Sequence, residues 1–164
     1  MTDVGRQRAS SAEVALADPL GPDAQHCLAQ YFGELASRFK GGFAREADDA
    51  GAVEDFVPPT GCLLIARLQG RPVGCGALRT FDRGVGEIKR LWISPDARGL
   101  GLGRRLLEEL ERTARKYKMH AVRLDTNESL HEAIRLYQTA GYREIDRFND
   151  NPYAHHWFEK TLMG

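Results

Sequence analysis

The chain has 164 residues, of which 42% are hydrophobic and 28% are charged, and its 23 basic and 23 acidic side chains give a formal net charge of zero. This length and composition predict one globular domain, residues 1–164, with a buried core. The balanced charge argues against a dedicated nucleic-acid or membrane-surface binder, because such partners select an excess of Lys and Arg.

The cysteines and the N-terminus argue against a secreted or metal-binding protein. Cys27, Cys62 and Cys75 form no CxxC pair, and their small or apolar neighbours predict buried free thiols. No apolar run approaches the ~18 residues of a membrane span, and residues 1–14 carry no signal-peptide core or lipidation signal. We therefore expect a cytoplasmic protein without a bound metal.

One strand and one long helix are predicted in the N-terminal third. Residues 1–10 are expected to form a flexible tail and residues 14–18 a short strand. A helix is predicted from Pro22, since proline suits the first helical position. Its apolar face repeats at helical spacing and consists of Ala24, Leu28, Tyr31, Phe32, Leu35 and Phe39. The sequence KGG at 40–42 ends this helix, and the stretch that follows is irregular or partly helical.

Strands and helices then follow one another to the end of the chain. Apolar runs and turns predict three antiparallel strands at 62–68, 72–81 and 85–93. Helical periodicity begins at Leu102 and again over 130–140, and further strands are predicted at 120–126, 142–148 and 155–162. The expected fold class is α/β (α+β), a mixed central sheet of about six or seven strands flanked by about four helices.

The sequence RGLGLGRR, at 98–105, stands directly before a predicted helix. A helix N-terminus carries unpaired N–H groups and partial positive charge, and glycines there remove the Cβ atoms that would keep an anion away. A strand, a glycine turn and a helix therefore predict a phosphate site. The dinucleotide motif GxGxxG does not fit, because Leu106 stands at its third glycine, and no Gly-Lys-Ser/Thr of a P-loop is present.

Arginines flank this glycine run. Arg104 and Arg105 stand in the first helical turn, where a cation opposes the helix dipole by roughly 0.3–1 kcal/mol. One interpretation is that they pair with Glu108 and Glu109 on a solvated face. The other is that a polyanionic ligand compensates them and that Arg98 completes the clamp. The glycines favour the second interpretation.

Two further segments accompany the glycine run: EIKRLWISPDA, at 87–97, precedes it, and AIRLYQTAGY, at 133–142, follows. Together the three segments resemble motifs of the GCN5-related N-acetyltransferase (GNAT) superfamily. RGLGLG matches its Q/R-x-x-G-x-G/A acyl-CoA-binding motif, and the last segment is similar to its A-x-x-[LF]-Y-x-x-x-G-[FY] helix. The resemblance covers about residues 60–162, with the acyl-CoA-binding core at about 85–142.

The resemblance implies a site for acetyl-CoA as the acyl donor. Its diphosphate is expected on the glycine loop, at Arg98, Gly99, Leu100, Gly101, Leu102, Gly103 and Arg104. The pantetheine arm is expected along the backbone of Leu91, Trp92 and Ile93, with an amide near Leu91 facing the thioester carbonyl. Leu130 stands where the family often has an asparagine that bonds this arm, so Asn127 is a candidate for that role.

Tyr137 is the candidate proton donor. The family commonly places this tyrosine near the sulfur of CoA, and a phenol with a pKa of about 10 suits a donor to the departing thiolate. The alternative is a tyrosine that only packs in the core, because Tyr137 also stands on the apolar face of its helix.

Glu87 is the candidate general base. It stands eleven residues before Arg98, the offset at which histone-acetylating members of the superfamily carry a glutamate base. Alternation along the strand places Glu87 on one face with Leu91 and Ile93, so that it addresses the same cleft. The alternative is a solvated ion pair with a neighbouring cation.

The implied function is an N-acetyltransferase that moves an acetyl group from acetyl-CoA to a primary amine of a small molecule, or of a peptide, by direct attack in a ternary complex. The alternatives are a non-catalytic acyl-CoA-binding regulatory module and a protein lysine or N-terminal acetyltransferase. The acceptor pocket is expected from residues 31–43, Arg79 and the loop at 149–157, with Arg38 or Arg79 available to a carboxylate. Neither nucleic acid nor membrane is an expected partner, and the apolar content of the last strand is compatible with a homodimer.

Overall fold

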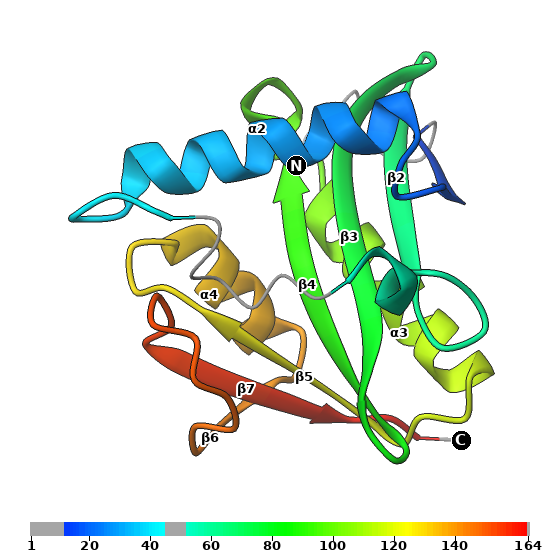
Figure 1. Cartoon of the computed structure of the whole chain (residues 1–164), viewed down its shortest axis with the longest axis vertical. Helices are drawn as coiled ribbons and strands as arrows, with labels where there is room; N and C mark the ends of the chain where they lie inside the picture. The colour runs from blue at the N-terminus through cyan, green and yellow to red at the C-terminus, as the bar shows by residue number, and fades with distance from the viewer. Residues whose placement is uncertain (1–11, 45–51, 164) are drawn as a thin grey trace.

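The computed structural model describes residues 12–44 and 52–163, which form a seven-stranded mixed sheet with the order β1-β2-β3-β4-β5-β7-β6 (Figure 1). The strands are β1 (Glu13–Leu16), β2 (Cys62–Leu68), β3 (Arg71–Asp82), β4 (Val85–Ile93), β5 (Ala121–Thr126), β6 (Arg143–Ile145) and β7 (His156–Thr161). Neighbouring strands pair antiparallel except β4 and β5, which are parallel. The intervening helix is the crossover that a parallel pair requires.

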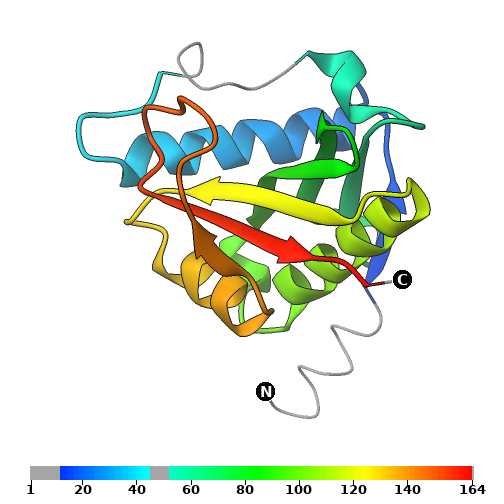
Figure 2. The same ribbon diagram turned by 90° about the horizontal axis from the view of Figure 1, so that it is seen from below.

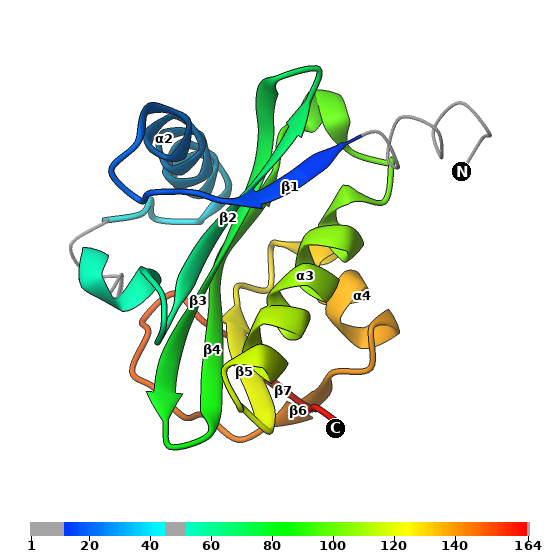
Figure 3. The same cartoon turned by 90° about the vertical axis from the view of Figure 1, so that its right-hand side faces the viewer.

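Helices cover both faces of the sheet. α2 (Pro22–Arg38) lies on one face, and α3 (Leu102–Lys116) and α4 (His131–Thr139) lie on the other, as Figure 2 and Figure 3 show. The core on the α3 side includes Leu106, Leu107, Leu110, Val122 and Phe158. The core on the α2 side includes Ala24, Cys27, Ile65, Cys75 and Trp92. In the described part of the chain, no helix is long and apolar enough to cross a membrane.

The predicted fold class is confirmed, with differences in two places. The described residues contain three α-helices rather than about four, because the segment before β2 forms only one 3-10 turn, η2 (Val53–Phe56). A second 3-10 turn, η3 (Pro95–Ala97), follows β4. The strand expected at 142–148 ends at Ile145, because Phe148 leaves the sheet and packs edge-on against Phe81, with ring centroids 5.1 Å apart. The tail expected at 1–10 lies outside the described residues.

A β-bulge interrupts β4. Cys75 pairs with Trp92 and Ala77 pairs with Lys89, so two residues of β4, Arg90 and Leu91, stand opposite the single residue between them on β3. Arg90 has a φ of +59°, in the left-handed region that few side chains adopt. An extra residue in one strand changes which face the following side chains occupy.

The bulge makes the predicted alternation along β4 wrong. Leu91 and Ile93 pack against the core on the α3 side. Lys89 is paired with Ala77, which belongs to the core on the α2 side, and Glu87 lies 3.8 Å from the Lys89 ammonium. Glu87 and Lys89 therefore face α2, opposite to Leu91 and Ile93.

β4 and β5 diverge after Glu87, before the bulge is reached. They pair only over Val85–Glu87 and Ala121–Arg123, although β4 continues to Ile93. The backbone of β4 after Glu87 therefore has a free edge toward β5, because its neighbour on that side has moved away. This gap between the strands positions the site.

Candidate active site

The glycine loop opens α3 with its amide groups exposed. Gly99 and Gly101 have φ values of +81° and +82°, which glycine adopts without the steric penalty of a Cβ atom. Gly101 is the N-cap residue, no side chain caps the helix, and the first helical bond runs from the Arg105 amide to the Gly101 carbonyl at 3.1 Å. The amides of Leu102, Gly103 and Arg104 therefore point out of the helix start, where the dipole favours an anion.

A cavity of about 230 Å³ lies against this loop. It is lined by Tyr31, Glu34, Leu35, Arg38, Leu91, Trp92, Ile93, Ala97, Arg98, Gly99, Gly101, Leu102, Gly103, Leu130, Glu132, Ala133 and Leu136. Most of the residues that the sequence assigns to the acyl donor thus lie around one cavity. Leu100 packs against the core instead, and Arg104 donates a hydrogen bond to Thr139 of α4 at 2.8 Å. The guanidinium of Arg105, another cation of the predicted clamp, bonds the Ala12 carbonyl.

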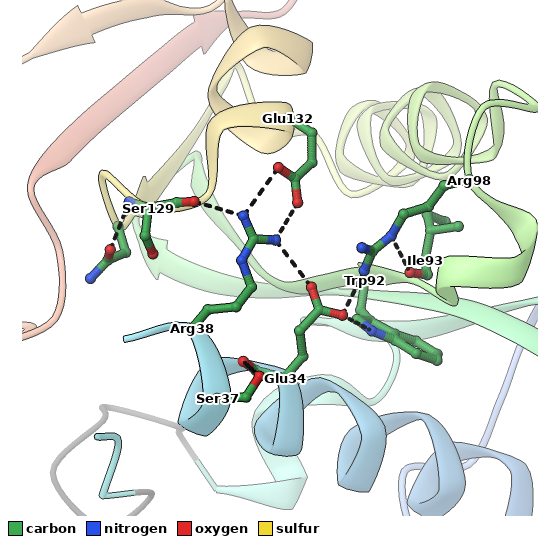
Figure 4. Close-up of polar contacts among 9 residues, drawn as sticks. Glu34, Ser37, Arg38, Trp92, Ile93, Arg98, Ser129 and Glu132 are labelled. Atoms are coloured by element: carbon green, nitrogen blue, oxygen red, sulfur yellow. Dashed lines mark hydrogen bonds and ion pairs between the residues drawn. The ribbon is translucent and has the colours of Figure 1, made fainter. Parts of the chain in front are cut away.

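Ion pairs cross this cavity from α2, as Figure 4 shows. The Arg98 guanidinium lies 2.6 Å from the Glu34 carboxylate and also donates to the Ile93 carbonyl at 3.0 Å. Arg38 contacts both Glu34 and Glu132 of α4, and its hydrogen bond lowers the pKa of the Glu132 carboxyl. Arg98, the side chain expected to bind the diphosphate, is therefore already paired with the carboxylate of Glu34.

A second cavity, of about 70 Å³, lies in the gap between β4 and β5. It is lined by Ile88, Lys89, Arg90 and Leu91 of β4, by Asp125, Thr126 and Asn127 at the end of β5, by Tyr31, Leu35 and Phe39, and by Phe43, Leu130, Ala133, Tyr137, Asn151, Tyr153 and Ala154. The two cavities are adjacent, because they share the lining residues Tyr31, Leu35, Leu91, Leu130 and Ala133, and together we call them the groove.

Tyr137 lines the second cavity with its side chain held by neighbouring rings. It is 6% exposed, and its ring centroid lies 5.9 Å from that of Tyr142 and 6.1 Å from that of Phe158. Burial, together with the negative charge of Asp125, raises the pKa of the Tyr137 phenol well above its ordinary value. The hydroxyl is therefore protonated at neutral pH, as a proton donor must be.

Glu87 lies behind the second cavity. It is 1% exposed, and its carboxylate accepts hydrogen bonds from Arg79 at 2.9 Å and from the Asn149 amide at 3.3 Å. The β4 residues that line the cavity begin one position later, at Ile88. The ion pair expected as the alternative is present, but it is buried rather than solvated.

Arg38 and Arg79, the two cations expected to be available to a ligand carboxylate, each already contact two carboxylates of the chain. Arg38 contacts Glu34 and Glu132, and Arg79 contacts Glu87 and Asp55.

Asn127 is turned toward the neighbouring loop. Its amide donates to the Tyr153 carbonyl at 2.7 Å, and its oxygen accepts from the Ser129 amide at 2.9 Å. Asn127 still lines the second cavity.

Asp125 lines the same cavity, and its carboxylate accepts hydrogen bonds from Asn149 at 2.6 Å and Asn151 at 3.2 Å. Sequence reasoning missed Asp125, because a single acidic residue near the end of a strand carries no motif. The Asn-Asp-Asn sequence of the loop at 149–151 was the available signal, since amide side chains are common partners of a partly buried carboxylate.

Comparison with known proteins decides the family. Residues 28–142, more than half of the chain, match the family model "Acetyltransferase (GNAT) family". The chain belongs to the GNAT acetyltransferase family.

Relatives of this GNAT protein include enzymes with different names. It is 35% identical over 128 residues to the IAA acetyltransferase of Azospirillum brasilense, covering 77% of this chain and 78% of that protein. It is also 35% identical over 105 residues to an uncharacterized N-acetyltransferase of Schizosaccharomyces pombe, of which the match spans 64% of the length, and 63% of this chain. A Klebsiella pneumoniae protein assigned as an acyl-CoA N-acyltransferase is 31% identical, with a TM-score of 0.76 and coverage of 93% of this chain and 98% of that one.

The described residues of this GNAT domain contain no group of three or more His, Cys, Asp and Glu side chains that could hold a metal ion. The three cysteines are buried and free. Burial raises the pKa of the Cys62 thiol to about 11.

Proposed function

We propose that the protein is an acyl-CoA-dependent N-acetyltransferase that moves the acetyl group of acetyl-CoA to a primary amine of a compact small molecule, by direct attack in a ternary complex. The observation that carries this proposal is the groove of two adjacent cavities, one at the glycine loop and the other at Tyr137. One end offers donors for a diphosphate, and the other end offers a proton donor and room for a second reactant.

The glycine-loop end suits the diphosphate of acetyl-CoA. The amides from Gly99 to Arg104 and the guanidinium of Arg98 would bind it, since both kinds of donor favour a phosphate oxygen. A structure of the same fold, N-acetylglutamate synthase of Neisseria gonorrhoeae, is complexed with coenzyme A. The pantetheine arm would run along the free edge of β4 at Leu91, Trp92 and Ile93.

The chemistry would take place where β4 and β5 diverge. The amine nitrogen attacks the thioester carbonyl, and a backbone amide near Leu91 would stabilise the oxyanion. When the carbon–sulfur bond breaks, Tyr137 would give its proton to the thiolate of CoA. The role of Glu87 as the general base stays a prediction; because Glu87 is not among the residues that line the cavity, it would have to act through a water molecule.

The size of the second cavity favours a compact acceptor over a peptide. At about 70 Å³ it is smaller than the cavity of about 230 Å³ at the glycine loop. Relatives are named for different compounds, IAA and mycothiol, so the acceptor class has to come from the cavity itself.

The test is a binding measurement followed by a thiol-release assay. Acetyl-CoA at 100 times its Kd should stabilise the folded protein by about 2.7 kcal/mol. CoA release should then depend on an added amine from a panel of amino acids, polyamines, aminoglycosides and peptides. Absence of acetyl-CoA binding would refute the proposal, and binding without release over the whole panel would identify a non-catalytic acyl-CoA-binding module.

A further inference from the structure

We propose that the acceptor amine carries a carboxylate, so that the substrate class is a compact amino-carboxylate, with Lys89 as the partner of its carboxylate and Asp125 as the partner of its amine. This inference rests on the proposed function, because it names the acceptor of the same groove. It is carried by the distribution of charge around the second cavity.

The β4 side of this cavity is positive. Lys89 lines it with a side chain that is 7% exposed, and a carboxylate oxygen of Glu87 lies 3.8 Å from its ammonium nitrogen. Glu87 is closer to Arg79, at 2.9 Å, so two cations share one buried carboxylate, and the other partner of Arg79, Asp55, is 45% exposed. Arg90 adds a second cation to the lining. A buried ammonium requires compensation, which a ligand carboxylate would give at shorter range than Glu87 does.

The β5 side of the cavity is negative. Asp125 accepts its hydrogen bonds from Asn149 and Asn151, which are neutral amides and therefore orient the carboxylate without cancelling its charge. Its charge acts on the phenol of Tyr137, so an amine held at Asp125 would lie near the proposed proton donor. The Asn149 amide nitrogen lies 2.6 Å from Asp125 and 3.3 Å from Glu87, and thus links the negative and positive sides across the strand gap.

An aromatic wall closes the cavity between these charges. The ring centroids of Phe43 and Tyr153 are 4.8 Å apart, and Phe39 lies 5.7 Å from each of them. The Tyr153 hydroxyl accepts a hydrogen bond from the Ala44 amide at 2.7 Å, which fixes the segment after α2 against the loop before β7. The wall offers an apolar surface to the body of the acceptor, and the opposed charges offer partners for its two ends.

The transfer is balanced with these residues. In this scheme Asp125 takes the place of Glu87 as the first acceptor: the ammonium of the acceptor gives one proton to Asp125, which releases it to solvent. The free amine then attacks, the new carbon–nitrogen bond forms, and the carbon–sulfur bond breaks. Tyr137 protonates the thiolate, and the second proton of the nitrogen restores the phenol. The products are the N-acetylated amino-carboxylate, the thiol of CoA and one proton.

The test compares amino acids with the amines that remain when their carboxylate is removed. CoA release is measured with alanine against ethylamine, valine against isobutylamine, and phenylalanine against 2-phenylethylamine. The kcat/KM of the unaltered protein should be at least tenfold higher for at least one amino acid than for its amine, the effect of one charge-assisted hydrogen bond. Lys89→Met should bring this ratio close to one, whereas Lys89→Arg should keep the preference.

Lys116→Met is the matched control, since Lys116 is exposed on α3, and it should keep the ratio of the unaltered protein. Equal use of every amino acid and its amine by the unaltered protein would overturn the inference without any variant. So would an unchanged ratio in folded Lys89→Met. Either result leaves the proposed function intact, whereas absence of acetyl-CoA binding, or of CoA release with every amine, rejects the proposed function itself.

Discussion

The ion pair between Glu34 and Arg98 predicts that removing one carboxylate will tighten the binding of acetyl-CoA. The pair is 2.6 Å long, and its side chains are 20% and 36% exposed. A partly exposed pair of this kind contributes up to about 1 kcal/mol, which must be given up before Arg98 can serve a diphosphate. Glu34→Gln should therefore lower the Kd for acetyl-CoA about fivefold, because 1.4 kcal/mol corresponds to about a factor of ten. Repulsion between Glu34 and the diphosphate acts in the same direction.

Isothermal titration of the unaltered protein and the variant with acetyl-CoA measures this effect. The glutamine oxygen can still accept from the Trp92 indole, which lies 3.3 Å from Glu34, so the fold should be retained. Glu109→Gln is the control, because it removes the same charge from a pair with Arg112 on the exposed side of α3. A Kd for Glu34→Gln that is unchanged or higher, with a folded protein, would show that Arg98 does not exchange Glu34 for the ligand.

Three further predictions concern the site and the stability of the fold. Tyr137→Phe should lower kcat by about a hundredfold or more while acetyl-CoA binding persists, and loss of the phenol without an effect on kcat would exclude it as the proton donor. Gly101→Ala should lower the free energy of unfolding by roughly 1–2 kcal/mol, because alanine is strained at a φ of +82°, and should weaken acetyl-CoA binding. Gly33→Ala, in an open position of α2, should instead be neutral or stabilising in the same urea titrations. The raised pKa of Cys62 stabilises the fold below pH 9.0, and this contribution, about 3 kcal/mol for a difference of about two in pKa, should be lost between pH 9.0 and about 11. Over this pH range the free energy of unfolding of Cys62→Ala should therefore decline by about 3 kcal/mol less than that of the unaltered protein. An equal decline in both proteins would contradict the assignment.

Much of the fold follows from local patterns in the sequence. α2 begins at Pro22, and β2 and β4 have the predicted bounds, because proline, glycine and apolar periodicity act over a few residues. The glycine loop could be assigned to an anion for the same reason, since its chemistry comes from backbone groups within one helical turn.

The features that sequence reasoning missed depend on contacts between distant segments. The alternation of side chains along a strand could not reveal the bulge at Arg90, because the bulge depends on how β4 pairs with β3. The pair between Glu34 and Arg98 joins residues 64 positions apart. Asp125 gains its place in the site only because β5 diverges from β4 and the loop at 149–151 folds over it. Such contacts are made by the tertiary fold and leave no periodic trace in the sequence.

The bulge in β4 also separates two parts of the strand whose side chains have different roles. Before it, side chains supply charge to the α2 side of the sheet. After it, Leu91 and Ile93 turn to the opposite core. Regular alternation through Arg90, without the bulge, would exchange these faces, so that Trp92 would turn away from Glu34 and Leu91 would face it. Arg90 takes part in no predicted chemical step, yet the bulge at this residue determines which side chains of β4 face the site.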